Sequence, residues 1–289
     1  MIGRALRAAW LALALALVSA GAPNLPASAQ ELAAGRVVFT GPLVQGGLVH
    51  GFAPVGTSGL MLDGKPIPIG AGGRFILGFD RDQPASAMLT IQGGGAPPLQ
   101  QRLAIAPRAW KIEKINAPRR PGGPTAEYLR KREFELARIA AARALSSDTS
   151  GWMQPFILPA RGRISGVFGS QRVYRGEPAA FHSGLDIAGG AGAAVIAPAD
   201  GIVVLSGPPM LSLEGNLVIV DHGMGLNSAF LHLSSYRVRQ GQTVKQGDTI
   251  GTIGATGRAT GPHLHWSVKW REARLDPQLL VQPPAPKAR

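Results

Sequence analysis

Short apolar runs broken by glycine constrain this chain more than any other feature of its sequence. Examples are RVVFTG from residue 36, GRFILGF from residue 73 and NLVIVDHG from residue 216. Runs of this kind, bounded by turn residues, are typical of strands rather than of long helices. The 39 glycines and 24 prolines among 289 residues indicate many turns. The sequence therefore predicts a mainly β protein.

The first 29 residues have the pattern of a secretory signal peptide. Arg4 and Arg7 precede an apolar run from about Ala8 to Val18, and the small residues Ala27–Ala29 follow. This order predicts export and cleavage after Ala29. An uncleaved anchor is the alternative, but a membrane span needs about 20 apolar residues. No later segment is apolar enough to span a bilayer, so we expect no span in the mature chain.

The net charge and the absence of cysteine limit which partners the protein can bind and which chemistry it can use. Without the two signal arginines, 28 of the 30 basic residues stand against 17 acidic residues, a formal charge of +11. Such a balance favours anionic partners, and the signal peptide makes a cell envelope a better expectation than nucleic acid. The absence of cysteine excludes disulfides and thiol nucleophiles. We expect a periplasmic location, with secretion as the alternative.

Composition divides the chain into five segments. After the signal peptide (1–29), residues 30–116 contain strand-like runs, and the Asp63-Gly64 pair predicts a hairpin. These residues predict a small β-sandwich-like domain. Residues 117–151 are predicted to form a hinge and a helical linker. Strand signals return in residues 152–281, which predict an antiparallel sheet or open barrel, and residues 282–289 predict a disordered tail.

One helix is expected between the two β regions. Good helix formers follow the hinge NAPRRPGGP, and Thr125 is available as the N-cap. The basic face of the helix is predicted to be solvated. Four apolar residues are predicted to form one buried stripe: Leu129, Leu136, Ile139 and Ala140.

Five of the six histidines lie in the C-terminal region, and two of them flank Leu264 in GPHLHW. Because side chains alternate along a strand, His263 and His265 share one face, about 6.6 Å apart, with Ser267 and Lys269. The opposite face is apolar and should pack inward: Leu264, Trp266, Val268 and Trp270. This spacing suits one histidine binding a metal while the other reaches a water or substrate on it.

A second motif, HSGLD, places His182 and Asp186 on either side of Gly184. Alone, this spacing is more typical of a surface ion pair. Together with a histidine of GPHLHW it supplies His, Asp and His, three zinc ligands that leave a fourth position open for water. That donor set is the composition of a catalytic zinc site, with one Zn²⁺ per chain.

The segments FHSGLDIAGGAGAAVIAPADGIVV, VIVDHGMGLNSAFLHLS and VRQGQTVKQGDTIGTIGATGRATGPHLHW resemble the M23, or lysostaphin-type (LytM), zinc metallopeptidases. The resemblance runs from about residue 162 to residue 280 and implies that His182, Asp186 and His265 bind zinc. It also implies that His232 and His263 are the catalytic histidines. A structural role is implied for His222. His50 lies outside the match and is predicted to be a surface histidine.

The resemblance implies an exported zinc metalloendopeptidase that hydrolyses amide bonds in the peptide cross-links of peptidoglycan. The upstream half also resembles the N-terminal β domain and helical connector of exported bacterial members. A non-catalytic adaptor that binds the cell wall or activates a wall amidase is the main alternative. A lipoyl-like carrier module, suggested by GQTVKQGDTIGTIG, is a third reading, but it leaves the histidines unexplained.

Overall fold

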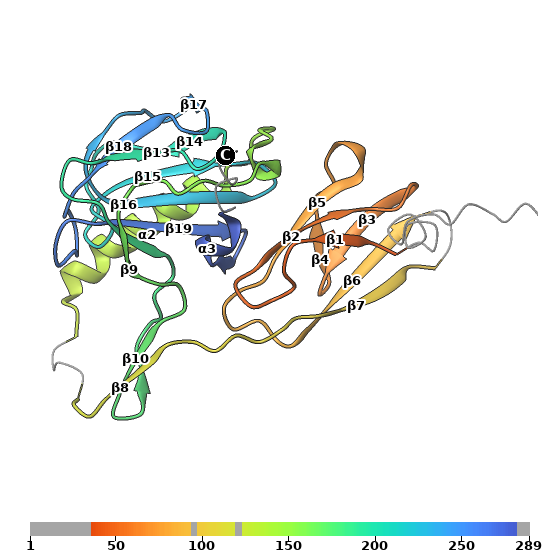
Figure 1. Ribbon diagram of the computed structural model, residues 1–289, viewed down its shortest axis with the longest axis horizontal. Helices are drawn as coiled ribbons and strands as arrows, with labels where there is room; N and C mark the ends of the chain where they lie inside the picture. The colour runs from red at the N-terminus through yellow and green to blue at the C-terminus, as the bar shows by residue number, and fades with distance from the viewer. Residues whose placement is uncertain (1–35, 94–96, 119–122, 282–289) are drawn as a thin grey trace, which may run out of the picture.

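The computed structural model describes residues 36–93, 97–118 and 123–281, which form two β-rich parts and a helix (Figure 1). The predicted signal peptide and tail lie outside the described residues. The prediction of a mainly β fold is confirmed, with a large antiparallel sheet in the C-terminal part and smaller sheets in the N-terminal part. In the described part of the chain, no helix combines the length and apolarity needed to cross a membrane.

The N-terminal part contains two antiparallel sheets, in the orders β1-β2-β5 and β4-β3-β6-β7. Their buried side chains share one core. The predicted hairpin joins β3 to β4, and Asp63 and Gly64 both have positive φ, as its two-residue turn requires. The strands are β1 (Val38–Thr40), β2 (Leu48–Phe52), β3 (Thr57–Leu62), β4 (Lys65–Ile67), β5 (Arg74–Gly78), β6 (Ser86–Gly93) and β7 (Leu99–Ala104).

The C-terminal part is built on a ten-stranded sheet whose main path is β17-β14-β15-β16-β19-β12-β9. Strand β18 pairs with β13 and β16, and β20 pairs with β19. The strands are β9 (Arg163–Gly166), β12 (Leu185–Ala188), β13 (Ala194–Ile196), β14 (Gly201–Leu205), β15 (Asn216–Asp221), β16 (Leu226–Tyr236), β17 (Thr243–Val244), β18 (Thr249–Ile253), β19 (Leu264–Trp270) and β20 (Ala273–Leu275). The short helix α3 (Pro277–Leu280) follows β20.

The alternation predicted for the last long strand is found in β19. Leu264, Trp266 and Val268 are fully buried, whereas His265 and Lys269 on the other face are half-buried. The apolar face packs into the core that also contains β12 and β16 residues. This packing leaves the histidine face of the sheet free to form a site.

A fourth sheet among the described residues, which the sequence did not predict, joins segments far apart in the chain. Strand β8 (Ile112–Ile115) pairs in parallel with β10 (Gln171–Tyr174), and β10 pairs with β11 (Glu177–Pro178). Figure 1 shows this sheet below the large sheet, with the segment after β7 running toward it. Residues before the helix therefore pair with residues immediately upstream of the HSGLD motif.

Helix α2 (Ala126–Ala144) begins as predicted, because the Thr125 side chain accepts a hydrogen bond from the Tyr128 N–H. The predicted apolar stripe is wrong. Leu129 and Leu136 are half exposed, Ala140 is exposed and Ile139 is only partly buried; the buried residues are Glu135 and Ala142.

Polar contacts explain why this helix docks on another face. Arg132 makes a bidentate ion pair with Glu214 at 2.6 and 2.5 Å and also contacts Glu135. Arg138 donates to the carbonyls of Gly207, Pro208 and Pro209, and Arg143 donates to Asn227. The prediction of a solvated basic face is therefore wrong for these three arginines. Charged groups can be buried when they are paired in this way.

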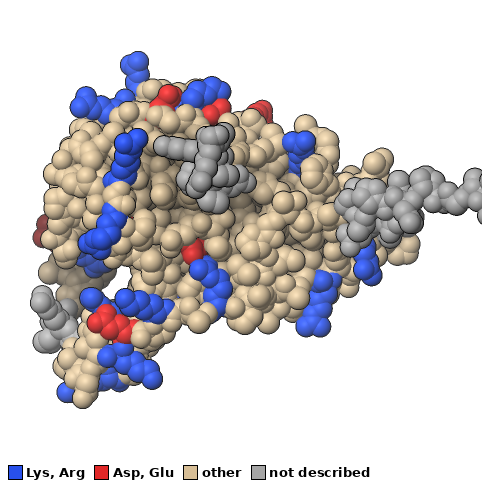
Figure 2. Space-filling model, in the orientation of Figure 1, with Lys and Arg blue, Asp and Glu red and all other residues tan. Residues whose placement is uncertain are grey.

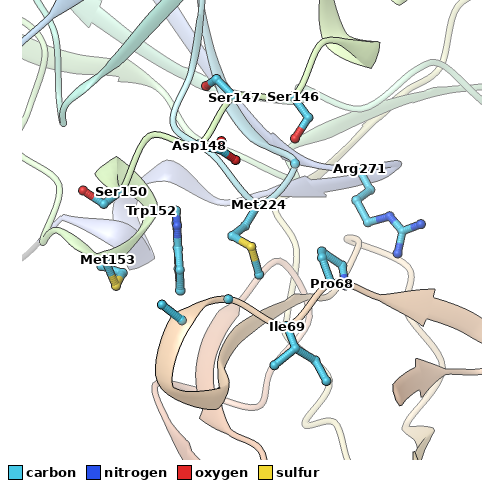
Figure 3. A pocket seen from close by; sticks show the side chains of 13 residues that line it. Pro68, Ile69, Ser146, Ser147, Asp148, Ser150, Trp152, Met153, Met224 and Arg271 are labelled. Atoms are coloured by element: carbon cyan, nitrogen blue, oxygen red, sulfur yellow. The ribbon is translucent and has the colours of Figure 1, made fainter. Parts of the chain in front are cut away.

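The two β parts are in direct contact. A buried Asp276, only 3% exposed in its side chain, pairs with Arg108 at 2.8 Å. A cavity of about 660 Å³ lies at the same boundary (Figure 3). Ile69 lines it from the N-terminal part, and Met224 and Arg271 line it from the C-terminal part. None of the histidines lines this cavity.

His50 is not the surface histidine that was predicted. It lies on β2, is half-buried, and stacks on Trp152 with ring centroids 6.3 Å apart. Burial lowers its pKa. The boundary between the two parts, which the sequence does not reveal, covers a side chain that would be exposed on an isolated N-terminal sheet.

His222 is fully buried and should make the stability of the fold depend on pH. Its Nδ1–H donates to the Asp200 carbonyl at 2.8 Å and its Nε2 lies 2.9 Å from the Ser228 hydroxyl. Burial lowers its pKa from 6.5 to about 4. The unfolded chain therefore binds more protons between these values, and the contribution of His222, complete above pH 6.5, is lost as pH falls toward 4.

We expect the free energy of unfolding to fall by roughly 2 kcal/mol more between pH 7 and pH 5 in the wild type than in His222→Asn. Asparagine keeps an N–H for the Asp200 carbonyl but does not titrate. Urea unfolding of both proteins in the presence of a chelator measures the difference, because every other titrating group is common to both. Equal pH dependence would show that His222 is not the group responsible.

Candidate metal centre

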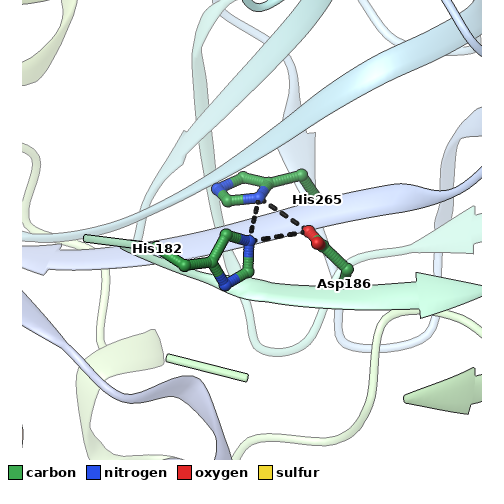
Figure 4. Close-up of side chains that lie close together, drawn as sticks. All are labelled: His182, Asp186 and His265. Carbon is green, nitrogen blue, oxygen red and sulfur yellow. Dashed lines mark hydrogen bonds and ion pairs between the residues drawn. The ribbon is translucent and has the colours of Figure 1, made fainter. Parts of the chain in front are cut away.

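His182, Asp186 and His265 converge on one point (Figure 4). Asp186 Oδ1 lies 3.0 Å from His182 Nε2 and 2.8 Å from His265 Nδ1, and the two nitrogens are 3.1 Å apart. Among the described residues, these three form a group able to hold a metal ion, and all are partly buried. The structure thus brings together the residues predicted to bind zinc.

Strand pairing places two members of this triad side by side. Asp186 on β12 is the direct cross-strand partner of His265 on β19. His182 precedes β12, and Gly184 lets the intervening chain approach: a Cβ at Gly184 would lie 2.6 Å from His265 Nε2. A side chain at residue 184 would therefore clash with the ring of His265. The Nε2 of His265 faces Gly184, and its Nδ1 faces the triad.

Electrostatics favours an ionised carboxylate. Burial tends to raise the pKa of Asp186, but hydrogen bonds from His182 and His265 outweigh it and hold the pKa well below its usual range. Burial would lower the pKa of His182, but the bond to Asp186 raises it overall. Burial lowers the pKa of His265. A single negative charge thus sits between two imidazoles, each of which offers a lone pair to a metal once that nitrogen has lost its proton.

This donor set fits a zinc ion. Four-coordinate zinc takes His nitrogen and carboxylate oxygen at about 2.0–2.2 Å, which puts its ligand atoms roughly 3.3 Å apart. The three separations in the triad are within a few tenths of an ångström of that value. Three protein ligands also leave one tetrahedral position open, as in catalytic rather than structural zinc sites.

His232 and His263 lie at the edge of the triad. The ring centroid of His232 is 4.9 Å from that of His263 and 6.2 Å from that of His265. His263 Nε2 is 3.9 Å from Asp186 Oδ1. All five predicted site residues are therefore close together, whereas His50 and His222 lie elsewhere.

Backbone carbonyls orient the imidazoles. The Nδ1–H of His182 donates to Val167, that of His232 to Thr256 and that of His263 to Gly261, at 2.8 to 3.0 Å. Because Nδ1 donates a hydrogen bond in each of these rings, Nε2 is the nitrogen left to bind a metal or to transfer a proton. These carbonyls were not predicted, and no sequence signal reveals them, since every residue has one.

The backbone at His232 is unusual. His232 has φ +63°, in the left-handed region that residues other than glycine rarely occupy. It sits where β16 changes partner, since Leu231 pairs with β19 while Leu233 pairs with β18. Backbone strain of this kind is found most often at functional sites. Burial lowers the pKa of His232, so its imidazole is neutral at neutral pH.

A carboxylate and two imidazoles held by antiparallel strands, with two further histidines beside them, define a single-cation site of the kind used by metal-dependent hydrolases. The comparisons then identify the family. Residues 180–277 match the model of peptidase family M23. A crystal structure of an M23 peptidase from Pseudomonas aeruginosa is 30% identical, with a TM-score of 0.62, over 82% of this chain and 94% of that chain. The chain belongs to peptidase family M23.

Two curated relatives each match less than half of this chain. The DD-carboxypeptidase/endopeptidase Mpg of Neisseria meningitidis is 36% identical over 125 residues, 42% of this chain and 27% of the relative. The murein hydrolase activator NlpD of Salmonella dublin is 33% identical over 134 residues, 46% of this chain and 33% of the relative. The matched regions therefore span a third or less of these relatives.

Proposed function

We propose that this chain is an exported zinc metalloendopeptidase that hydrolyses amide bonds in the peptide cross-links of peptidoglycan. The observation that supports this best is the convergence of three ligand atoms within 3.1 Å of one another, with His232 and His263 beside them. The similarity to the Neisseria DD-carboxypeptidase/endopeptidase supports the reaction class.

His182, Asp186 and His265 would hold the zinc ion. Zinc bound by such a set lowers the pKa of a water molecule to about 7 and polarises a carbonyl oxygen. A neutral His232, with Nδ1 bonded to Thr256, presents Nε2 as an acceptor for the proton of the attacking water. His263 can donate a hydrogen bond to the oxyanion or a proton to the leaving amine. The two roles are interchangeable on this geometry.

The proposed setting is the cell envelope, with the periplasm favoured over secretion and peptidoglycan as the partner. Figure 2 shows Lys and Arg side chains spread over both parts of the molecule, with few acidic ones between them. This distribution suits a polyanionic wall. We expect no nucleic-acid partner.

The direct test is digestion of cross-linked peptidoglycan by the purified mature protein, with and without a chelator. We expect about one zinc per chain and release of uncross-linked muropeptides, which the chelator abolishes and added zinc restores. Chromatography of the released fragments measures this. Release that is insensitive to the chelator would contradict the proposal.

The alternative is a non-catalytic adaptor that activates a wall amidase, favoured by the similarity to the Salmonella murein hydrolase activator. Such a protein need not hold a metal. Bound zinc with no release of fragments, together with stimulation of a purified amidase, would favour the adaptor. The completeness of the ligand triad favours the enzyme.

A further inference from the structure

The loop before β10 controls both the backbone and the ring of His182. The His182 Nδ1–H donates to the Val167 carbonyl at 3.0 Å. The Gly169 N–H donates to the His182 carbonyl, and the His182 N–H donates to the Ser170 carbonyl, each at 2.8 Å. Any shift of residues 167–171 must therefore move the His182 ring and its Nε2.

Arg81, from the N-terminal β part, holds this loop. Its Nε donates to the Gly169 carbonyl and its Nη2 donates to Gln171 Oε1, both at 3.1 Å. Gly169 is thus fixed on both sides, with its carbonyl on Arg81 and its N–H on His182. Arg81 and Gly169 are 88 positions apart in the sequence.

The guanidinium of Arg81 is buried, with its side chain 7% exposed. It lies 4.7 Å from the ring centroid of Phe181, the residue before His182, and 5.3 Å from that of Trp110. Its ion-pair partner, Asp82, is 62% exposed and screened by water. The buried charge therefore depends on the loop acceptors and the two aromatic rings.

We propose that Arg81 is a positioning residue for the metal centre, through which the N-terminal β part preorganises His182. The inference rests on the proposed zinc site. Groups that orient metal ligands from behind commonly change metal affinity 10- to 100-fold when mutated. The N-terminal part would then be required for tight metal binding by the peptidase part.

A matched control exists at the same boundary. Arg271 also donates to a backbone carbonyl of the other part, that of Pro66, but it lines the cavity in Figure 3 and does not touch the His182 loop. Loss of Arg271 removes one hydrogen bond to the other part, and loss of Arg81 removes two. Only loss of Arg81 should affect the metal centre.

The test uses the full mature chain and two metal ions as probes. Zinc affinity is measured by competition with a chromophoric chelator, and ligand geometry by the visible absorption of the Co²⁺-substituted protein. We expect Arg81→Gln to weaken zinc binding about 10- to 100-fold and to alter the Co²⁺ spectrum. Arg271→Gln should leave both at wild-type values. Arg81→Lys, which cannot reproduce the planar fork, should show a smaller loss in the same direction.

Wild-type zinc affinity in the Arg81 variants would overturn the inference, as would an equal loss in Arg271→Gln. If Arg81→Gln does not fold, the zinc affinity of Arg81→Lys is compared with that of the wild type instead, and an unchanged affinity would overturn the inference. Failure of the wild type itself to bind zinc would instead overturn the proposed zinc site. The two failures are thus distinguishable without measuring activity.

Discussion

His265→Ala is expected to abolish zinc retention in the purified protein. His265 supplies Nδ1, which lies 2.8 Å from Asp186 Oδ1 and 3.1 Å from His182 Nε2, so its loss leaves only two ligands. Structural zinc sites bind with about 10–16 kcal/mol shared among four ligands, so one ligand is worth roughly 3 kcal/mol or more. Affinity should fall at least about 10²-fold. Elemental analysis after gel filtration measures the retained metal.

Ser267→Ala is the matched control for this variant. Ser267 lies on the same face of β19 two residues further on, is buried, and is not a member of the triad. It should keep about one zinc per chain. Thermal unfolding in excess chelator separates metal loss from misfolding, since the two apo variants should melt at similar temperatures. Near-stoichiometric zinc in His265→Ala would remove His265 from the ligand set.

The part of the site that was predictable from the residues themselves depends on a short-range rule. Period-two alternation put His263, just before β19, and His265, within it, on one side of the chain. The apolar residues on the opposite face of β19 are buried as expected. Resemblance to a known family supplied the pairing of Asp186 with His265, which the strand register now explains. The roles of all five residues stay predictions until metal and activity are measured.

The docking of α2 was not predictable by counting apolar residues. Its amphipathic pattern pointed to Leu129 and Leu136, yet the surface it meets presents Glu214 and the carbonyls of residues 207–209. Charge-assisted hydrogen bonds from the arginines of α2 to these acceptors hold the helix on this surface. Which surface a helix will meet is a long-range property that a local pattern does not contain.

The contacts between the N-terminal part and the site were also not predictable, because they depend on long-range pairing. The parallel pairing of β8 with β10 and the contact from Arg81 to Gly169 join residues more than 50 positions apart. Neither follows from periodicity, because no local signal specifies a parallel partner or a distant carbonyl. The predicted domains consequently follow one another along the chain, whereas the loop that contacts His182 is also held by Arg81 of the N-terminal part.

Hydrogen bonds hold both the ring and the backbone of His232 in place. The bond from its Nδ1–H to the Thr256 carbonyl fixes the ring, and the His232 N–H donates to the Glu214 carbonyl at 2.8 Å. Glu214 is in turn held by Arg132 of α2. The left-handed backbone of His232 is thus supported from two sides, which is the condition under which such strain persists.

His232→Ala is expected to keep its zinc while turnover of cross-linked muropeptides falls about 10²-fold or more, the usual scale of acid and base catalysis. His232→Asn, which tolerates the left-handed backbone better than alanine, should show the same loss and guards against misfolding. Ser234→Ala, two residues further along β16 and bonded to Thr252, is the control and should retain activity. Because His232 and His263 would act on the same proton transfers, their double variant should lose much less than the product of the single losses. Full activity in His232→Ala with bound zinc would exclude His232 from the mechanism and leave His263 as the sole proton carrier beside the triad.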